Sequence, residues 1–562
     1  MKLVSQTYGR RLTVLAGGLL LAGCAATADE PTAAGPTPSE VDVALAAIDR
    51  GVIQSSLDYL AADDREGRFT GTPGYEDAAR YVAEQFAAIG LEAGGTDGWF
   101  QSVPMVSSRL NAQGSGITLH STDGNVELTW GKDFVAYPDL SRPSNRIRAE
   151  AVFVGYGVHA PTLGYSDYED VDVNGKIVVI FSGAPATLPS TERAHYSSGR
   201  TKADEMVRRG AIGQIAIANR RGEQSSPWDE TATNWGPDPE VTWVGVDGEV
   251  ADFHSEHEGY ASVGPGVAEQ LFANAPLTYQ QALDSGDDFV PAAAPLGIEV
   301  TMYRESDHER MASPNVVGIL RGSHPDLSAE YVVYSSHLDG LGVDAPVDGD
   351  AIYNGTWDNA IGVAFMLETA RALAELPVRP RRSIAFVAVT GEEIGLFGSD
   401  YFAQNPTVPT SAIVARVNID MPLVMFPLDT VTGYGAEHSS LEELMTVEAR
   451  KEGFEYTPDP YPDEVYFIRS DPYSFVRQGI PSLYLAKGVG SSDPAIDGRA
   501  VIDGFTRDHY HAPSDDLASQ PVDWETALRF VRASVRIGYR IATDEARPIW
   551  NDGDFFGDRF GR

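Results

Sequence analysis

The stretch YVVYSSHLD, residues 331–339, is a short, β-branched apolar run that ends in a histidine and an aspartate. The stretch SIAFVAVTGEE, residues 383–393, repeats this design and ends in two glutamates. Similar runs alternate with helix-like segments such as VAFMLETARALAEL between about residues 314 and 542. This alternation predicts an α/β fold with a mixed, mostly parallel central sheet flanked by helices. Open sheets of this kind gather their functional loops at the carboxyl ends of the strands.

Seven acidic or histidine side chains in this region are predicted to form one metal site, because most of them end or follow such runs. They are His337, Asp339, Asp358, Glu392, Glu393, Asp420 and His511. Carboxylates and imidazoles are the usual oxygen and nitrogen ligands of zinc. Each fragment alone has an ordinary explanation, since a GEE triplet commonly starts a helix and His–Asp pairs are frequent on surfaces. Their order and their repeated position after strands favour a shared site.

A hydrolase with two metal ions needs a bridging carboxylate, terminal ligands and a base. Asp358 precedes a helix, where a turn can aim its carboxylate at both ions. Glu392 and Glu393 are adjacent and point differently, so one can bind metal while the other accepts a proton. His509 competes with His511 as a ligand. The residues therefore offer each part of a two-metal site.

Composition excludes some functions. The chain has 562 residues, 43% of them hydrophobic, which predicts several folded domains. Asp and Glu outnumber Lys and Arg by 81 to 42, and the resulting charge of −39 makes binding to nucleic acid improbable. The single cysteine, Cys24, excludes internal disulfides and cysteine-based metal sites.

The first residues are typical of an export signal. Lys2, Arg10 and Arg11 precede a short apolar stretch that ends in Leu21-Ala22-Gly23-Cys24. This end resembles the bacterial lipobox, so residues 1–24 are predicted to be a lipoprotein signal peptide with lipidation at Cys24. Residues 25–40 are rich in Ala, Thr, Pro and Gly and are predicted to be a flexible tether. The resemblance implies an exported lipoprotein of the outer membrane, facing the periplasm or the cell surface.

The motifs HLDGLG, NGTWDNAIG, TGEEIGLFGSDYF, VNIDM and YHAPSD resemble those of the M28 family of zinc metallopeptidases, of the aminopeptidase Y type. Residues 111–300, with VFVGYGV and GKIVVI, resemble a protease-associated (PA) domain inserted into such an enzyme. The resemblance implies that residues 41–110 are the N-terminal part of the peptidase domain and residues 301–545 its catalytic part. Residues 546–562 form a tail of unassigned role.

The resemblance also implies a role for each candidate residue. Asp358 bridges two zinc ions, Glu393 and His511 complete one site, and His337 and Asp420 complete the other. The predicted catalytic residues are Glu392 as the general base, Asp339 as the group that orients His337, and Tyr510 as an oxyanion donor. Arg469 and Asp471, in RSDPYSF, are predicted to bind substrate, although Pro472 replaces a histidine that is common there.

The expected function is that of a zinc-dependent exopeptidase, in particular an aminopeptidase that removes N-terminal residues from peptides with a water held by two zinc ions. The expected partners are a peptide substrate and, through the lipid anchor, a membrane. Three alternatives stay open. They are a carboxypeptidase or dipeptidase, a glutaminyl cyclase of the same fold, and a non-catalytic, receptor-like binding protein; the complete ligand set disfavours the last.

Overall fold

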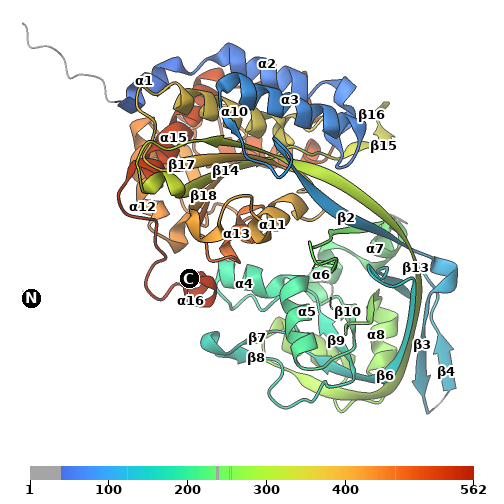
Figure 1. Cartoon of the computed structure of the whole chain (residues 1–562). Helices are drawn as coiled ribbons and strands as arrows, with labels where there is room; N and C mark the ends of the chain where they lie inside the picture. Colours follow the sequence, from blue (N-terminus) through green and yellow to red (C-terminus); the bar gives the residue numbers. More distant parts are fainter. Residues whose placement is uncertain (1–39, 123, 236–238, 252–253, 255, 463) are drawn as a thin grey trace, which may run out of the picture. The chain divides into compact units, whose positions relative to one another are not determined.

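The computed structural model describes residues 40–562 except positions 123, 236–238, 252–253, 255 and 463 (Figure 1). The predicted signal peptide, Cys24 and the tether as far as residue 39 lie outside the described residues. Among the helices that are described, none is both long enough and apolar enough to cross a bilayer.

We call the part of the protein that carries the predicted metal ligands the peptidase-like part. A mixed sheet forms its centre. Four parallel strands lie at its middle in the order β17 (Ser383–Val389), β14 (Tyr331–His337), β18 (Ile413–Ile419) and β21 (Ser482–Lys487). Flanking strands extend it: β13 (Ala293–Leu320), β2 (Phe100–Leu110), β11 (Glu240–Trp243) and β1 (Glu92–Ala93) beyond β17, and β19 (Thr430–Tyr434) and β20 (Glu455–Tyr456) beyond β21. The predicted α/β class with a mostly parallel central sheet is confirmed.

The register of the parallel strands brings their carboxyl ends together. His337 at the end of β14 pairs with Val389 at the end of β17. On the other side, Ile419 at the end of β18 pairs with Leu485 of β21. All residues of these strands are buried, as expected for parallel strands covered on both faces. The loops that follow the strands therefore leave the sheet at one edge.

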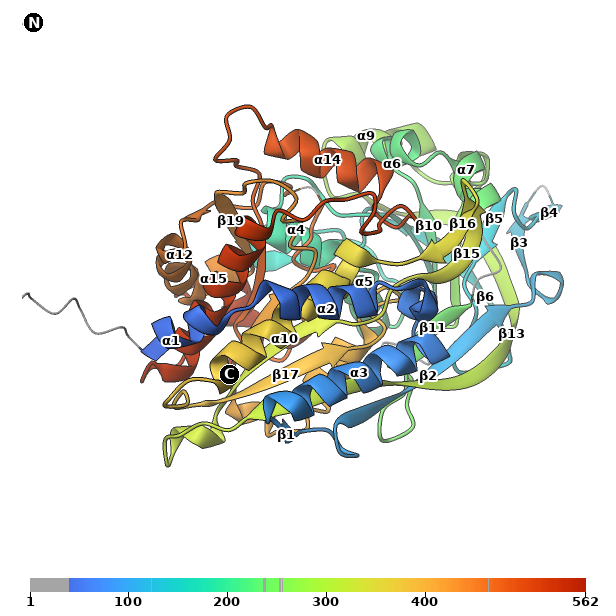
Figure 2. The ribbon, with the colours of Figure 1, turned by 90° about the horizontal axis from the view of Figure 1, so that it is seen from above.

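Helices cover both faces of this sheet (Figures 1 and 2). One face carries α1 (Glu40–Ala47), α2 (Arg50–Leu60), α3 (Pro73–Ile89), α10 (Ile361–Ala374) and α15 (Trp524–Thr543), and the other carries α11 (Phe397–Gln404) and α13 (Pro472–Val476). Helix α10 is buried on almost every side, because it lies between the sheet and the helices α2, α3 and α15. Its nearly continuous apolar sequence reflects that position. Helices α12 (Leu441–Lys451) and α14 (Gly498–Asp508) lie after β19 and β21 in the chain.

A second sheet follows the order β4 (Gly124–Glu127), β3 (Gly116–Ser121), β13, β6 (Ser144–Val154), β9 (Ile177–Phe181), β10 (Gly213–Ile217), β12 (Gly259–Val263) and β5 (Phe134–Ala136). Its helices are α4 (Ser190–Ser197), α5 (Gly199–Arg208), α6 (Arg220–Ser225), α7 (Trp228–Asn234), α8 (Pro265–Leu271) and α9 (Tyr279–Asp287). Short hairpins β7 (His159–Ala160) with β8 (Tyr165–Ser166) and β15 (Gly342–Val347) with β16 (Asp350–Tyr353) complete the strands.

This second sheet has its own hydrophobic cluster, drawn from residues between Ile117 and Met302. The long strand β13 belongs to both sheets, since its first half pairs with β3 and β6 and its second half with β2 and β17. The predicted domain boundary at residue 300 therefore falls inside a continuous strand. The PA-domain assignment and the predicted domain limits stay predictions.

The C-terminal residues pack onto the protein through α16 (Phe555–Phe560). Phe556 is buried beside Phe467 and Tyr473 of the peptidase-like part. His195 of α4 lies against the rings of Phe555 and Phe556, so the end of the chain also contacts the second sheet's helices.

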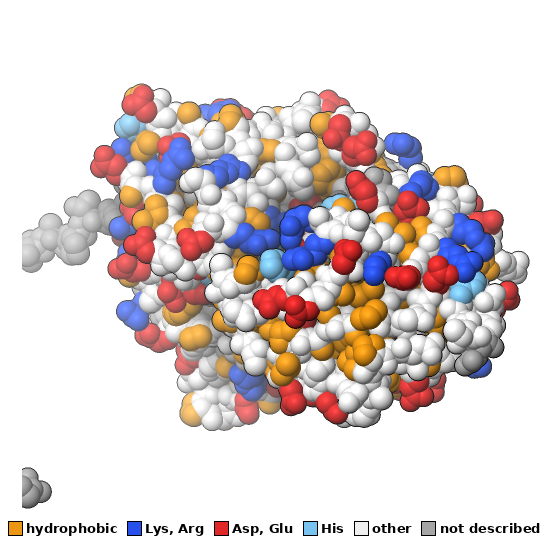
Figure 3. Space-filling view, turned by 90° about the horizontal axis from the view of Figure 1, so that it is seen from below, with side chains coloured by type: hydrophobic (Ala, Val, Ile, Leu, Met, Phe, Trp, Pro, Cys, Tyr) orange, Lys and Arg blue, Asp and Glu red, His pale blue; other side chains and the backbone are white. Residues whose placement is uncertain are grey.

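On the face seen in Figure 3, Lys and Arg side chains gather near the middle and acidic side chains surround them.

Candidate metal centre

The carboxyl edge of the central sheet gathers the seven predicted residues. His337 ends β14, and Asp339 follows two residues later. Glu392 and Glu393 follow β17, and Asp420 directly follows β18. The remaining two come from loops: Asp358 precedes α10, and His511 follows α14.

These side chains form two groups that share one carboxylate. In the first group, His337 Nε2 lies 3.1 Å from Asp358 Oδ1 and 3.2 Å from Asp420 Oδ1. In the second group, His511 Nε2 lies 3.4 Å from Asp358 Oδ2 and 3.1 Å from Glu393 Oε2. The donor atoms within each group all lie within 4.8 Å of one another. Asp358 thus presents one oxygen to each group.

The donor atoms of both groups fit a pair of zinc ions. Each group offers an imidazole nitrogen and two carboxylate oxygens, which are ligand types that zinc accepts. Four of the five ligands have nearly inaccessible side chains, and His511 is 40% exposed. Carboxylates packed this densely repel one another unless cations neutralise them. Since Asp358 faces both groups, it is the residue that would bridge two ions.

The backbone at His511 adopts an uncommon conformation. Its φ of 56° lies in the left-handed region, which few residues other than glycine adopt. Such outliers cluster at functional sites, where the surrounding structure holds them. The Tyr510 ring stacks on the His511 ring at a centroid distance of 3.8 Å. His509, the competing candidate, instead contacts Ser514 Oγ at 2.9 Å and is in neither group.

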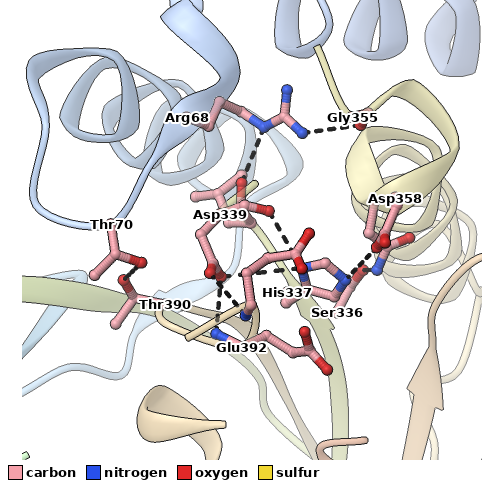
Figure 4. Close-up of polar contacts among 12 residues, drawn as sticks. Arg68, Thr70, Ser336, His337, Asp339, Gly355, Asp358, Thr390 and Glu392 are labelled. Carbon is pink, nitrogen blue, oxygen red and sulfur yellow. Dashed lines mark hydrogen bonds and ion pairs between the residues drawn. The ribbon is translucent and has the colours of Figure 1, made fainter. Parts of the chain in front are cut away.

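Asp339 contacts the loop that carries the two glutamates (Figure 4). The amide N–H groups of Glu392 and Glu393 donate to its two carboxylate oxygens, each at 3.2 Å. Its carboxylate lies 3.9 Å from His337 Nδ1, whereas its carbonyl oxygen lies 3.2 Å from the same nitrogen. Asp339 therefore holds the glutamate loop and, mainly through its backbone, the tautomer of His337.

Burial and neighbouring charges shift the pKa values of the residues in this site. Burial raises the pKa of Glu392 well above its ordinary value. Burial also raises the pKa of Glu393, to about 7, with help from the charge of Asp358. Burial opposes the charge on His511, but contacts with Asp358 and Glu393 raise its pKa to about 10. Burial likewise opposes ionisation of Asp358, yet both histidines lower its pKa.

Three polar residues that the sequence reasoning missed support this cluster. The carboxylate of Asp515 accepts the amide N–H groups of Trp357 and Asp358 at 3.0–3.2 Å. Asn359 donates to Ser336 Oγ at 3.0 Å and to the carbonyl of Ile419 at 3.2 Å. Asp515 lies in the motif YHAPSD and Asn359 in the motif NGTWDNAIG, so each is close in sequence to a predicted metal ligand. This closeness was the signal that could have identified them.

The third supporting residue is Arg68, which is buried beside the loops of the site. Its guanidinium donates to the carbonyl oxygens of Leu60, Leu338, Asn354 and Gly355 at 2.6–3.0 Å. The acceptors come from α2 and from the loops around Asp339 and Asp358. Three of these four acceptors lie 270–287 residues away in the sequence, so no local pattern indicated this role.

Gly355 permits the close approach of these loops. Its φ is 55°, and a Cβ there would lie 2.4 Å from the carbonyl oxygen of Asp358 and 3.1 Å from an Arg68 nitrogen. A side chain at this position would therefore displace the backbone that presents Asp358.

The two predicted substrate-binding residues belong to neither metal-ligand group. Arg469 is exposed, and its guanidinium lies 3.9 Å from the Glu464 carboxylate. Asp471 is completely buried, 3.6 Å from the Arg416 guanidinium, and its charge adds to the effect of burial in raising the pKa values of Asp339 and Glu392. Their roles, and that of Tyr510 as an oxyanion donor, stay predictions.

Residues 315–537 match the sequence model of Peptidase family M28. The resemblance to this family of metallopeptidases is thus confirmed for the part of the chain that holds the ligands.

Named proteins are similar to parts of this chain. Aminopeptidase NAALADL1 of Mus musculus is 33% identical over 159 residues, which are 26% of this chain and 20% of that protein. A probable zinc metalloprotease of Pyrenophora teres f. teres is 36% identical over 120 residues, which are 20% of this chain and 24% of that protein. The matched segments thus span about a fifth to a quarter of these relatives. Among solved structures, an aminopeptidase from Aneurinibacillus sp. strain AM-1 aligns with a TM-score of 0.49 and 19% identity, over 91% of this chain and 98% of that one.

Proposed function

We propose that this chain is a zinc-dependent aminopeptidase that hydrolyses the N-terminal peptide bond of peptides. The observation that carries the proposal is the sharing of Asp358 between two three-residue ligand groups, with Glu392 beside them and outside both. Similarity to a probable leucine aminopeptidase 2 of Aspergillus oryzae, 24% identical over 250 residues, supports the same activity. Those residues cover 42% of this chain and 47% of that protein.

In this proposal, His337, Asp420 and Asp358 would hold one zinc ion, and Asp358, Glu393 and His511 would hold a second. Bound zinc supplies Lewis acidity that polarises a peptide carbonyl and lowers the pKa of water. Glu392 takes a proton from the attacking water and delivers it to the nitrogen of the leaving amine. Its raised pKa makes Glu392 a stronger base than an ordinary carboxylate.

The acidic surroundings favour a substrate with a free amino terminus. Glu392 belongs to neither ligand group, so its carboxylate stays free when ions are bound and can attract an α-ammonium group. A substrate with a blocked amino terminus lacks this attraction. This reasoning favours aminopeptidase activity over cleavage from the carboxyl terminus.

The test compares leucine p-nitroanilide with its N-acetylated form in the zinc-loaded protein. We expect hydrolysis of the free amine only, its loss after treatment with a chelator, and its return when zinc is added. Hydrolysis of the N-acetylated substrate at an equal rate, or release of C-terminal residues from N-blocked peptides, would overturn the assignment to aminopeptidases.

The export signal belongs to the same proposal: acylation of Cys24 would hold the enzyme at a membrane outside the cytoplasm. The lipobox-like residues 21–24 support it. Replacement of Cys24 by alanine should move the protein from the membrane fraction to the soluble fraction of the producing cells. Equal membrane association of both proteins would refute the anchor.

A further inference from the structure

The peptide group between Asp420 and Met421 is held by side chains at both of its ends. The hydroxyl of Tyr484 donates to the carbonyl oxygen of Asp420 at 2.9 Å. The amide N–H of Met421 donates to the side-chain oxygen of Asn359 at 3.3 Å. The carbonyl and the N–H of a planar trans peptide point in opposite directions, so the two hydrogen bonds together fix the orientation of this peptide group.

The two side chains come from different parts of the fold. Tyr484 lies on β21, where it pairs with Asn418 on β18, two residues before the predicted ligand Asp420. Asn359 directly follows Asp358, the ligand that both groups share. Both residues are buried, Tyr484 with 4% and Asn359 with none of its surface exposed. The backbone of one ligand is therefore held by a neighbouring strand and by the loop of another ligand.

The backbone that follows Asp420 is one that needs such support. Met421 and Leu423 have φ angles of 36° and 40°, in the left-handed region that few residues other than glycine adopt. Such conformations persist only where the surrounding structure enforces them. Without its hydrogen bonds, the peptide group after Asp420 can turn towards a more favourable conformation. The carboxylate of Asp420 would then change its direction as well.

Asn359 extends this support to the other ligands of the first group. Its side-chain nitrogen donates to Ser336 Oγ at 3.0 Å and to the carbonyl oxygen of Ile419 at 3.2 Å. Ser336 and Ile419 each directly precede a ligand of this group. One set of hydrogen bonds thus connects the segments that carry all three ligands: His337, Asp358 and Asp420.

We propose that Tyr484 is a positioning residue for one of the two metal ions, the ion of the first group. Its hydroxyl holds the peptide group of Asp420 so that the carboxylate meets the other two ligands. The inference rests on the proposed zinc-dependent function and assigns a role to a residue that is in neither ligand group. Among the described residues, the Tyr484 hydroxyl forms a hydrogen bond with Asp420 alone, so its effect should be confined to the first group.

The opposing explanation is that Tyr484 only fills space in the core. Its ring centroid lies 5.2 Å from that of Tyr434, and a phenylalanine ring would fill the same space. A packing role predicts that removal of the hydroxyl leaves zinc binding unchanged. A positioning role predicts weaker zinc binding even though the ring is kept.

The test uses two proteins that each retain one complete ligand group. His511→Ala removes a ligand of the second group alone, and His337→Ala removes a ligand of the first group alone. Competition with a chromogenic chelator measures the zinc affinity of the group that remains. Adding Tyr484→Phe to His511→Ala should weaken zinc binding by about tenfold to a hundredfold, the range typical of a lost group that orients a ligand. Adding it to His337→Ala should leave the affinity unchanged.

Tyr334→Phe is the matched control. Tyr334 is also fully buried, and its hydroxyl also donates to a backbone carbonyl oxygen, that of Ser534, at 2.6 Å. It lies three residues before His337 on β14, so the two side chains point to opposite faces of the sheet. Tyr334→Phe should leave the zinc affinity unchanged in both single-group proteins. Circular dichroism and thermal unfolding of the metal-free proteins establish that each variant is folded.

A second measurement uses the protein with both ligand groups intact, and it decides the question even if a single-group protein does not fold. Transfer of zinc from the loaded protein to an excess of chelator gives the release rate of each ion. In Tyr484→Phe, we expect one ion to leave about tenfold to a hundredfold faster than in the wild type, and the other at the wild-type rate.

The positioning role is refuted if a folded Tyr484→Phe protein binds and releases zinc as the wild type does. It is also refuted if Tyr334→Phe has an equal effect, or if Tyr484→Phe accelerates the release of both ions equally. Absence of zinc binding by the wild type would instead contradict the proposed metal centre, and the role of Tyr484 would fall with it.

Discussion

Asp358 and Glu392 have different roles in the proposed site: Asp358 would bind the metal ions, and Glu392 would transfer protons. Asp358 directs one oxygen to each ligand group, so its carboxylate cannot also accept a proton while ions are bound. Glu392 lies outside both groups, and burial raises its pKa. The neighbouring Glu393 belongs to the second group, so two adjacent glutamates have different tasks because the backbone after β17 turns between them.

Replacement of Glu392 by glutamine should lower kcat by about a hundredfold to ten-thousandfold, the range typical of a lost general base. The amide has nearly the same shape but cannot accept the proton. Zinc content should stay at the wild-type level because Glu392 is in neither ligand group. Steady-state kinetics with metal analysis provides the check, and near-normal turnover would rule out Glu392 as the base.

Replacement of Asp515 by alanine should weaken zinc binding by about ten- to a hundredfold, as is typical when a group that orients a ligand is lost. Its carboxylate fixes the amide N–H groups of Trp357 and Asp358. Competition with a chromogenic chelator measures the affinity. Asp516→Ala is the matched control, and an affinity unchanged in Asp515→Ala would show that Asp358 needs no such support.

The strand ends and the loops between them set the geometry of the site. The parallel strands bring His337, the glutamate loop and Asp420 to one edge. Asn359 ties the start of α10 to β14 and β18, while Arg68 ties α2 to the loops around Asp339 and Asp358. The site is therefore built from elements that are far apart in sequence.

Replacement of Arg68 by methionine should lower the free energy of unfolding by about 3 kcal/mol or more, because it leaves buried carbonyl oxygens without donors. Four carbonyl groups lose their partner. Urea unfolding measures the change. Arg80→Met, on the exposed side of α3, should change stability by less than about 0.5 kcal/mol. Equal stability of the two variants would show that Arg68 does not brace the site.

Sequence patterns predicted the parallel strands and the helices on either side, because fully buried strands and amphipathic helices leave clear periodicities. They also predicted the seven residues that the structure gathers at the carboxyl edge of the central sheet, because most of these residues end or follow an apolar run. They could not predict Arg68 or Asp515 as supports, since hydrogen bonds to distant backbone groups leave no periodic trace. Nor could they show that β13 continues through residue 300, because a shared strand resembles two separate ones.

The whole described chain is joined by contacts between the two sheets and the C-terminal residues. Asp400 of α11 is buried and accepts from Trp243 Nε1 and Arg200 Nη2, each at 3.0 Å. His438 Nδ1 lies 2.6 Å from Asp554 Oδ2 at the start of α16. These contacts place the tail, whose role the sequence did not reveal, among the structural supports of the peptidase-like part.

The pair His438–Asp554 should make stability depend on pH. Burial opposes the charge on His438, but Asp554 raises its pKa; burial also opposes ionisation of Asp554, and His438 lowers its pKa. The stabilisation of the folded protein that comes from the raised pKa of His438 is fully present below about pH 6.5. It is lost as the pH rises through the pKa that His438 has in the folded protein. The stabilisation that comes from the lowered pKa of Asp554 is fully present above about pH 3.9. It is lost as the pH falls through the pKa that Asp554 has in the folded protein.

Asp554→Asn should therefore destabilise the protein more at pH 5.5 than at pH 9, by about 1–3 kcal/mol at the lower pH. The asparagine oxygen can still cap α16, so the ion pair is the main loss. Thermal unfolding at both pH values provides the comparison. A larger loss at pH 9 would contradict the assigned direction of the His438 shift.

The proposed two-metal centre depends on Asp358 more than on any other residue, because its carboxylate belongs to both ligand groups. Zinc content per chain, measured together with hydrolysis of leucine p-nitroanilide, should be compared between the wild type and Asp358→Ala. We expect two zinc ions and activity in the wild type, and loss of both zinc and activity in a variant whose circular dichroism is unchanged. A folded Asp358→Ala protein that retains two zinc ions and normal turnover would contradict the shared-carboxylate site.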